Sequence, residues 1–170
     1  LGYLRDASIA FPYHTIHADI RKGTIALFLS EILAQSIREQ EPNQALFGYL
    51  ESALQWLDHH DQVANFHIRF LLGLSRYLGF YPDRTLAGAP YFDLGEGAFV
   101  REPSLHPVLS GELLGFFNRF LESGFENLDQ IRIGQAQRRE LLQALVAYYG
   151  IHLPGFREPR SLAVLDAVYS

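Results

Sequence analysis

Histidines are the residues of this chain that would first suggest a metal site. The sequence has seven of them and no cysteine. His14 and His17 lie three residues apart and His59 and His60 are adjacent, whereas helical zinc sites usually place two histidines four residues apart with a glutamate close by. We therefore expect surface or helix-capping histidines, and we predict that the protein binds no metal ion and uses no cofactor.

Arginine and lysine side chains are sparse, but they occur in small groups that would suit an acidic partner. The chain has 14 of them. Arg69 and Arg76 are seven residues apart and therefore share one face of a predicted helix, and Arg138 and Arg139 lie near the start of another. We predict that these four arginines and Lys22 bind an acidic partner at the rim of an apolar groove. An ordinary solvated helix face would show the same pattern, so that interpretation stays open.

The apolar part of the predicted groove would come from Leu71 and Leu74, which stand between the two arginines of the same helix. Grooves of this type bind a peptide through hydrophobic anchors and a captured carboxylate. Arginine suits the carboxylate because its planar fork can bond both oxygens. The predicted occupant is an acidic peptide with an aromatic end.

Motifs of common enzymes are missing from the sequence. It contains no Gly-x-Ser-x-Gly, no Walker loop and no zinc-protease pair of histidines. Glu96 stands between two glycines, but no apolar strand precedes it and no helix follows, so this segment is a turn and not a phosphate cradle. We predict a protein without catalytic activity, although a triad assembled in space would leave no sequence motif.

Composition and charge indicate one soluble domain that binds DNA poorly by itself. Hydrophobic residues make up 48% of the 170 residues and charged residues 19%, which allows a real core and is unlike a disordered chain. No stretch is long and apolar enough for a membrane span, and we expect a cytoplasmic protein. The net charge is −5, whereas nucleic-acid-binding domains are usually basic.

Apolar periodicity and capping residues predict a mainly α-helical bundle. Asp19 is the expected N-cap of the first helix, and Gly79 and Gly150 are expected to end the third and the fifth. The predicted helices span residues 19–37, 43–58, 65–79, 111–122, 135–149 and 161–169. The expected buried stripes of the first three are Ile20, Leu27, Ile32, Leu33 and Ile37; Leu46, Phe47, Leu50, Leu54 and Leu57; and Phe66, Phe70, Leu71, Leu74 and Leu78.

Residues 80–110 interrupt the helical pattern. Glycines and prolines cluster there and the apolar residues are scattered, which predicts one long irregular loop insertion with at most a short β-hairpin near residues 91–100. Insertions of this length in a compact domain are often functional. Tyr91, Phe92 and Phe99 are expected to hold the loop in place by packing.

Five segments, taken in order, resemble the C-terminal helical domain of the RecO family of bacterial DNA repair proteins. They are DIRKGTIALFLSEIL (19–33), LFGYLESALQWLD (46–58), NFHIRFLLGLSRYLGFYPD (65–83), YFDLGEGAF (91–99) and RSLAVLDAVY (160–169). The resemblance covers residues 19–169, nearly the whole chain. Each segment is only weakly specific, and their order carries the assignment.

The resemblance implies a recombination mediator and not an enzyme. Members of the family bind single- and double-stranded DNA, anneal complementary strands and, with RecR, help to load RecA. Their N-terminal OB-fold would carry much of the DNA binding, and the absence of methionine also leads us to expect a longer protein. Residues 1–18 are then a linker from that domain, and residues 19–170 the helical domain. The implied partners are DNA, RecR and the acidic C-terminal tail of single-stranded DNA-binding protein, and the implied location is the nucleoid.

Many RecO proteins carry a four-cysteine zinc site in the insertion. Here the insertion has no cysteine, and its one histidine, His106, stands among dispersed carboxylates. The chain therefore resembles a zinc-free branch of the family. Two other functions stay open from the sequence alone: a helical interaction or regulatory domain unrelated to DNA, and a hydrolase that uses His and Asp side chains.

Overall fold

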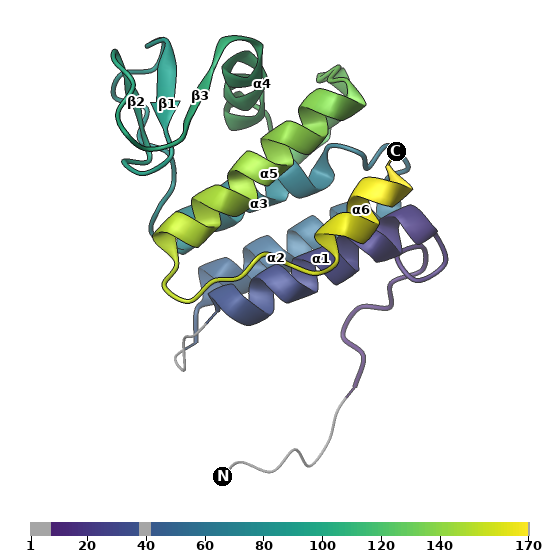
Figure 1. The fold of residues 1–170 in the computed structure, drawn as a ribbon. Coiled ribbons are helices and arrows are strands. Elements are labelled where there is room, and N and C mark those ends of the chain that lie inside the picture. The colour runs from purple at the N-terminus through teal and green to yellow at the C-terminus, as the bar shows by residue number, and fades with distance from the viewer. Residues whose placement is uncertain (1–7, 38–41, 170) are drawn as a thin grey trace.

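Helices make up most of the computed structural model, which describes residues 8–37 and 42–169. The helices are α1 (Ile20–Ser36), α2 (Gln44–His59), α3 (Phe66–Tyr77), α4 (Gly111–Glu122), the 3₁₀ helix η1 (Phe125–Gln130), α5 (Gln135–His152) and α6 (Leu162–Val168). Three strands, β1 (Tyr91–Asp93), β2 (Ala98–Val100) and β3 (Val108–Ser110), form a small sheet beside α4 at one end of the molecule (Figure 1). The predicted mainly α-helical class is confirmed.

Helix α3 is the centre of the bundle. It contacts α2, α4, α5 and η1, and Phe66, Phe70 and Leu74 are fully buried on it. Trp56 of α2 stacks on Phe66 with the ring centroids 5.6 Å apart. The apolar stripe predicted for this helix is confirmed except at Leu78, which is only half-buried.

The stripes predicted for the first two helices are partly wrong. Ile20 and Leu27 of α1 are 75% and 51% exposed, and Phe47 of α2 is 64% exposed. The chain has apolar residues on more than one face of these helices, and the bundle covers only one of them. The core face of α1 is made by residues at helical spacing, namely Ile25, Phe28, Leu29 and Ile32.

Side-chain caps begin the first two helices as predicted. Asp19 accepts a hydrogen bond from the Arg21 backbone N–H at 2.8 Å, and Asn43 accepts one from that of Leu46 at 3.0 Å. Gly79 follows α3 with a φ of 87° and is the predicted C-terminal glycine. Gly150, in contrast, does not end α5, which continues to His152.

The insertion contains the predicted hairpin and a third strand that was not predicted. Strand β1 pairs antiparallel with both β2 and β3, so the strand order is β2-β1-β3. Phe92 and Phe99 are buried, with ring centroids 5.1 Å apart, and Phe92 also packs 4.6 Å from the Phe117 ring of α4. Packing of these two phenylalanines therefore holds the insertion to the bundle, as expected, while Tyr91 is only half-buried.

A buried carboxylate organises the rest of the insertion. Asp93 accepts hydrogen bonds from the backbone N–H groups of Gly95 and Glu96 at 2.8 and 2.9 Å. It also accepts one from the Ser104 hydroxyl and contacts His106 Nδ1 at 3.1 Å. Asp93 is fully buried, and these contacts hold its pKa below the usual range although burial opposes this.

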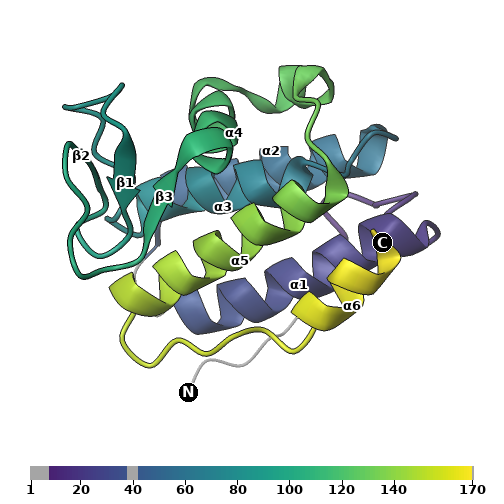
Figure 2. The same ribbon diagram turned by 45° about the horizontal axis from the view of Figure 1, so that its top comes forward.

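An extended segment connects α5 to α6 and runs along α1 (Figure 2). We call residues 153–161 the strap. The Glu31 carboxylate of α1 accepts hydrogen bonds from the backbone N–H groups of Arg160 and Ser161 at 2.7 and 3.2 Å, and the Gln35 side chain accepts one from that of Arg157 at 2.8 Å. The strap thereby places α6 beside α1.

Candidate partner-binding cleft

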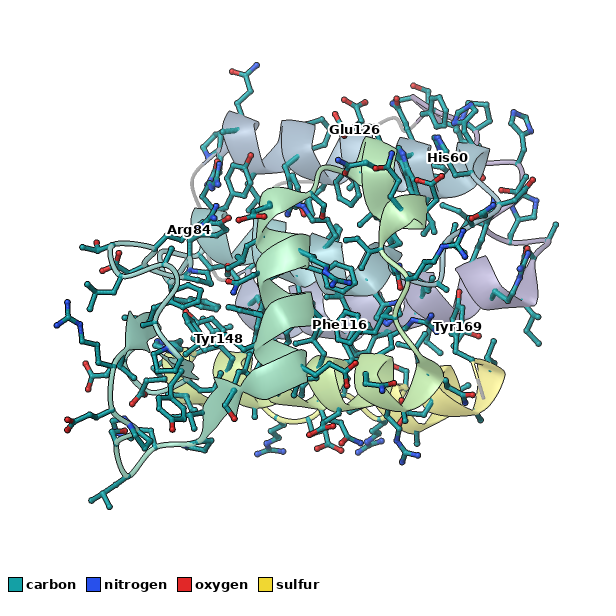
Figure 3. The ribbon with its side chains drawn as sticks, turned by 90° about the horizontal axis from the view of Figure 1, so that it is seen from above. His60, Arg84, Phe116, Glu126, Tyr148 and Tyr169 are labelled. Atoms are coloured by element: carbon teal, nitrogen blue, oxygen red, sulfur yellow. The ribbon has the colours of Figure 1, made fainter. Side chains whose placement is uncertain are left out.

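An open cleft of about 600 Å³ lies where α1, α3 and α5 begin. Val63, Leu128, Ile131 and Ile133 give it apolar walls. We call it the arginine cleft, because three arginines line it: Arg21, Arg132 and Arg138. Tyr169, which also lines the cleft, lies at the end of the molecule opposite the Arg84 and Tyr148 end (Figure 3).

Asn65 fixes the inner wall of the arginine cleft. Its amide nitrogen donates to the backbone carbonyls of Leu128 and Ile131 at 3.0 and 2.8 Å. Its amide oxygen accepts from Arg138 Nε at 3.1 Å, and Arg138 Nη2 donates to the Ile133 carbonyl at 3.1 Å. A single buried amide therefore orients both the loop after η1 and the guanidinium of Arg138.

The charges around the cleft are mixed. Arg21 pairs with Asp19 at 2.7 Å, which lowers the pKa of that carboxyl to about 2 through the side-chain hydrogen bond. Arg132 is exposed and has no ion pair with the described residues. Two carboxylates, Asp61 and Asp129, also line the cleft. Three helix N-termini border the same space, and each carries a partial positive charge.

Lys22 is not at the surface, so its predicted place on a partner-binding rim is wrong. It is 1% exposed, and its ammonium donates to Thr15 Oγ1 at 2.7 Å and to the Asp58 carbonyl at 2.9 Å. The Asp58 carboxylate in turn accepts from the backbone N–H groups of residues 14–16. Lys22 therefore binds the segment before α1 to the end of α2.

Arg69 and Arg76 lie on α3 but contact different neighbours. Arg69 is half-buried, and its Nε donates to the Ser123 carbonyl at 2.7 Å while its guanidinium lies 5.7 Å from the centroid of the Phe125 ring. Arg76 is exposed, with its guanidinium 4.4 Å from the Tyr81 ring centroid. Neither of them lines the arginine cleft.

The apolar groove predicted along α3 is also wrong. Leu71 and Leu74 are fully buried in the core, so they cannot anchor a peptide. Of the predicted residues, only Arg138 lines the arginine cleft. Arg139 is the next residue along α5, and its Nε pairs with Asp166 of α6 at 2.9 Å.

Four cleft residues were missed from the sequence: Arg21, Arg132, Asn65 and Tyr169. Arg21 and Arg132 had a signal in their positive charge, and Arg21 directly precedes Lys22 in the sequence. No sequence signal pointed to Asn65 or Tyr169. An asparagine before a helix is usually interpreted as an N-cap, and a tyrosine near the end of an amphipathic helix as a core residue. Asn65 makes no side-chain cap to its own helix, and its bonds reach 63 and 66 residues along the chain.

The Asp93, Ser104 and His106 side chains come together without the arrangement of a nucleophile and its base. The Ser104 hydroxyl donates to Asp93, and the same oxygen accepts the backbone N–H of His106. The imidazole also contacts Asp93 and makes no hydrogen bond to the serine. A triad requires the serine to donate to the histidine, so this cluster supports structure.

Metal-binding geometry is missing from the part of the chain that the structure describes. No group of three or more His, Cys, Asp or Glu side chains there has the geometry to hold an ion. Within the same residues, no helix has the length and apolar character needed to cross a membrane.

Comparison with known proteins gives one consistent match. Residues 17–162 match the family model described as "Recombination protein O C terminal". The whole chain is 43% and 42% identical to the DNA repair protein RecO of Flavobacterium psychrophilum and of Flavobacterium johnsoniae, and spans 71% of each. RecO of Bacteroides fragilis is 36% identical over 98% of the chain and 70% of its own length. No solved structure matches. The chain therefore belongs to the RecO family of DNA repair proteins.

Proposed function

We propose that this chain acts in homologous recombination at the nucleoid by binding and handing over its partners, without making or breaking a bond. Membership of the RecO family supports a role in DNA repair. The proposal adds RecR and single-stranded DNA-binding protein as partners, and strand annealing and loading of RecA as the outcome. Membership of this family favours this role over that of an interaction domain unrelated to DNA.

The arginine cleft is the observation that carries the proposed partner contact. An acidic peptide with an aromatic end needs an apolar surface and positive charge within a few ångströms of it. The cleft supplies the apolar walls of Ile131 and Ile133, each 8% exposed, the guanidinium groups of Arg132 and Arg138, and the positive ends of three helices. We propose that it receives the acidic tail of single-stranded DNA-binding protein.

The main DNA-binding surface is proposed to lie outside this chain. With a net charge of −5, the domain can neutralise few phosphates, and phosphate contacts supply most nonspecific affinity. We propose that residues 1–18 link this helical domain to an N-terminal OB-fold. Partner binding and DNA binding would then belong to separate domains of one protein.

A labelled peptide tests the cleft. We expect micromolar binding of the acidic tail, weakened by added salt. Arg132→Glu should weaken binding about tenfold or more, consistent with the loss of a charged hydrogen bond. Arg101→Glu is the matched control, because Arg101 is equally an exposed arginine but lies in the insertion; this variant should bind like the unmodified chain.

The same experiment separates the cleft from the other candidate arginines. Arg76→Glu reverses an exposed charge on α3, and Arg139→Glu breaks the contact with Asp166. If Arg76→Glu weakens binding and Arg132→Glu does not, the peptide lies on the face of α3 and the cleft assignment is wrong. If the peptide does not bind at all, this chain is not the receptor for the tail.

A further inference from the structure

His67 is buried beneath α6 and Tyr169, the residue that follows it. The side chain is 2% exposed, and its Nδ1 has no hydrogen-bond partner among the described residues. Its ring centroid is 5.9 Å from that of Tyr169 and 6.3 Å from that of Phe28 of α1. A narrow space of about 20 Å³ borders the imidazole, and Leu165 and Tyr169 form part of its wall. Removing α6 would therefore open His67 to water.

Helix α6 packs along α1 but buries few of its own side chains fully. It is seven residues long, and of its side chains only Leu162 and Leu165 are buried. An ion pair joins Asp166 of α6 to Arg139 of α5, and backbone N–H groups of the strap before α6 donate hydrogen bonds to Glu31. Short elements with little buried apolar surface open at low free-energy cost while the rest of a domain stays folded.

Tyr169 connects α6 to the arginine cleft. Its side chain and that of Arg138 line both the cleft and the narrow space beside His67, and so divide the two. The Tyr169 hydroxyl also donates to the Arg21 carbonyl at 3.5 Å, a long hydrogen bond. When α6 leaves, the cleft loses a wall and becomes continuous with the space over His67.

We propose that α6 is a proton-sensitive latch on the arginine cleft. In the closed state α6 covers a neutral His67, and Tyr169 closes the inner end of the cleft. In the open state α6 is undocked, the imidazole is in water, and a proton bound there prevents α6 from returning. The latch itself is independent of the proposed function, whereas its effect on peptide binding rests on that function.

The sign of the pH effect follows from the two states. In the closed state burial, and then the nearby Arg138 charge, lower the pKa of His67 to about 3, whereas an exposed histidine has a pKa of about 6.5. Above pH ~6.5 the imidazole is neutral in both states and closure is unaffected. As the pH falls below that value, the open state takes up a proton and the closed state does not, so closure is progressively lost.

The charged groups around His67 do not reverse this sign. Arg138 and Arg139 of α5 border the same space and repel a second cation. Asp166 of α6 is paired with Arg139. Burial raises the pKa of the Tyr169 phenol, which therefore stays neutral, and Phe28 of α1 offers only an apolar ring.

Hydrogen exchange of the α6 amides tests the latch directly. The measurement uses the whole chain at pH 7.5 and 5.5, corrected for the intrinsic rate at each pH. A shift from about 6.5 to about 3 predicts that the opening equilibrium of α6 rises about tenfold between these values. Protection of α3 and α4 should stay unchanged, because the rest of the bundle does not open.

Two variants assign the effect to His67. His67→Leu has no proton to gain, so its α6 protection should be equal at both pH values. His17→Gln, which alters an exposed histidine near the start of α1, should keep the tenfold change. The proposal is overturned if α6 protection in the unmodified chain changes less than twofold, or if His67→Leu responds to pH as the unmodified chain does.

A measurement on the unmodified chain covers the case in which His67→Leu does not fold. In a histidine-labelled NMR titration, the His67 ring should stay neutral as long as the α6 amides are protected, and should become protonated together with their loss of protection. An imidazole that titrates near pH 6.5 while α6 remains closed would overturn the latch.

Discussion

Replacement of Asn65 by alanine tests the central structural argument for the arginine cleft. The variant removes one amide group that makes three hydrogen bonds: to the Leu128 carbonyl, to the Ile131 carbonyl and to the guanidinium of Arg138. Asn65 itself is 8% exposed. The change should therefore loosen the loop after η1 and leave Arg138 without the acceptor that orients it.

The expected cost follows from the types of hydrogen bond. A buried bond between neutral groups contributes about 0.5–1.5 kcal/mol, and one that involves a charged group about 1.5–3 kcal/mol. Two neutral bonds and one charged bond then give roughly 2.5–6 kcal/mol. Water from the open cleft can form hydrogen bonds with some of the groups that lose the Asn65 amide. We therefore expect the free energy of unfolding to fall by about 3 kcal/mol. With an unfolding entropy of about 2.1 cal/mol/K per residue, a chain of 170 residues should melt roughly 8 °C lower.

Chemical denaturation of matched variants measures this loss. Gln62→Ala is the control, because Gln62 is also an amide at the cleft but is exposed and makes no hydrogen bond with the residues that the structure describes. It should change the free energy of unfolding by less than about 0.5 kcal/mol. The acidic peptide should also bind several times more weakly to Asn65→Ala than to Gln62→Ala, since Arg138 loses its orientation.

A small effect would refute the reasoning. If Asn65→Ala costs under about 1 kcal/mol, or no more than Gln62→Ala, the amide does not hold the cleft wall. If the free energy of unfolding falls as expected but peptide binding is unchanged, Asn65 stabilises the cleft wall and the peptide does not bind through Arg138.

Four further predictions concern the core, the buried lysine, metal and DNA. Phe70→Ala should cost roughly 3–5 kcal/mol in denaturation, because Phe70 is fully buried, while Phe47→Ala, at a 64% exposed position, should cost less than about 1 kcal/mol. Lys22→Ala should cost about 2–4 kcal/mol, since the hydrogen-bond acceptors Thr15 and Asp58 lose a buried charged donor. EDTA should leave the melting temperature unchanged, and elemental analysis should find no stoichiometric transition metal. Single-stranded DNA should bind at most weakly and in a salt-sensitive manner, and submicromolar binding at physiological salt would contradict the division of labour between domains.

The sequence predicts the helices well wherever local chemistry decides their ends. Asp19 and Asn43 cap α1 and α2 with their own side chains, and such caps involve residues two or three positions apart. Gly150 misled the prediction because it has ordinary helical conformation, and packing of α5 carries the helix past it to His152. The wrong stripe on α1 has a similar cause, since Ile20 and Leu27 follow a plausible spacing while the bundle buries the neighbouring face.

The candidate functional surface was harder to predict, because its contacts join residues that lie far apart in the sequence. A lysine near the start of a helix is expected at the surface. Lys22 is buried because it donates a hydrogen bond to the Asp58 carbonyl, which lies 36 residues away in the sequence. Arg138 was chosen from its charge for a groove along α3 and instead lines the arginine cleft, where the amide that orients it lies 73 residues away in the sequence. Charge placement therefore finds candidate arginines, and tertiary hydrogen bonds decide which of them line a cleft.

Hydrogen bonds to one buried carboxylate hold the insertion together. Many RecO proteins carry four cysteines in this segment, as noted in the sequence analysis, and this chain has none. Asp93 accepts hydrogen bonds from Gly95, Glu96 and Ser104 and contacts His106, so one buried carboxylate connects the turn between β1 and β2 to the loop before β3. A carboxylate with several hydrogen-bond donors is stable when buried because those donors offset its desolvation. These hydrogen bonds give the insertion a defined shape beside α4, where Phe92 packs on Phe117.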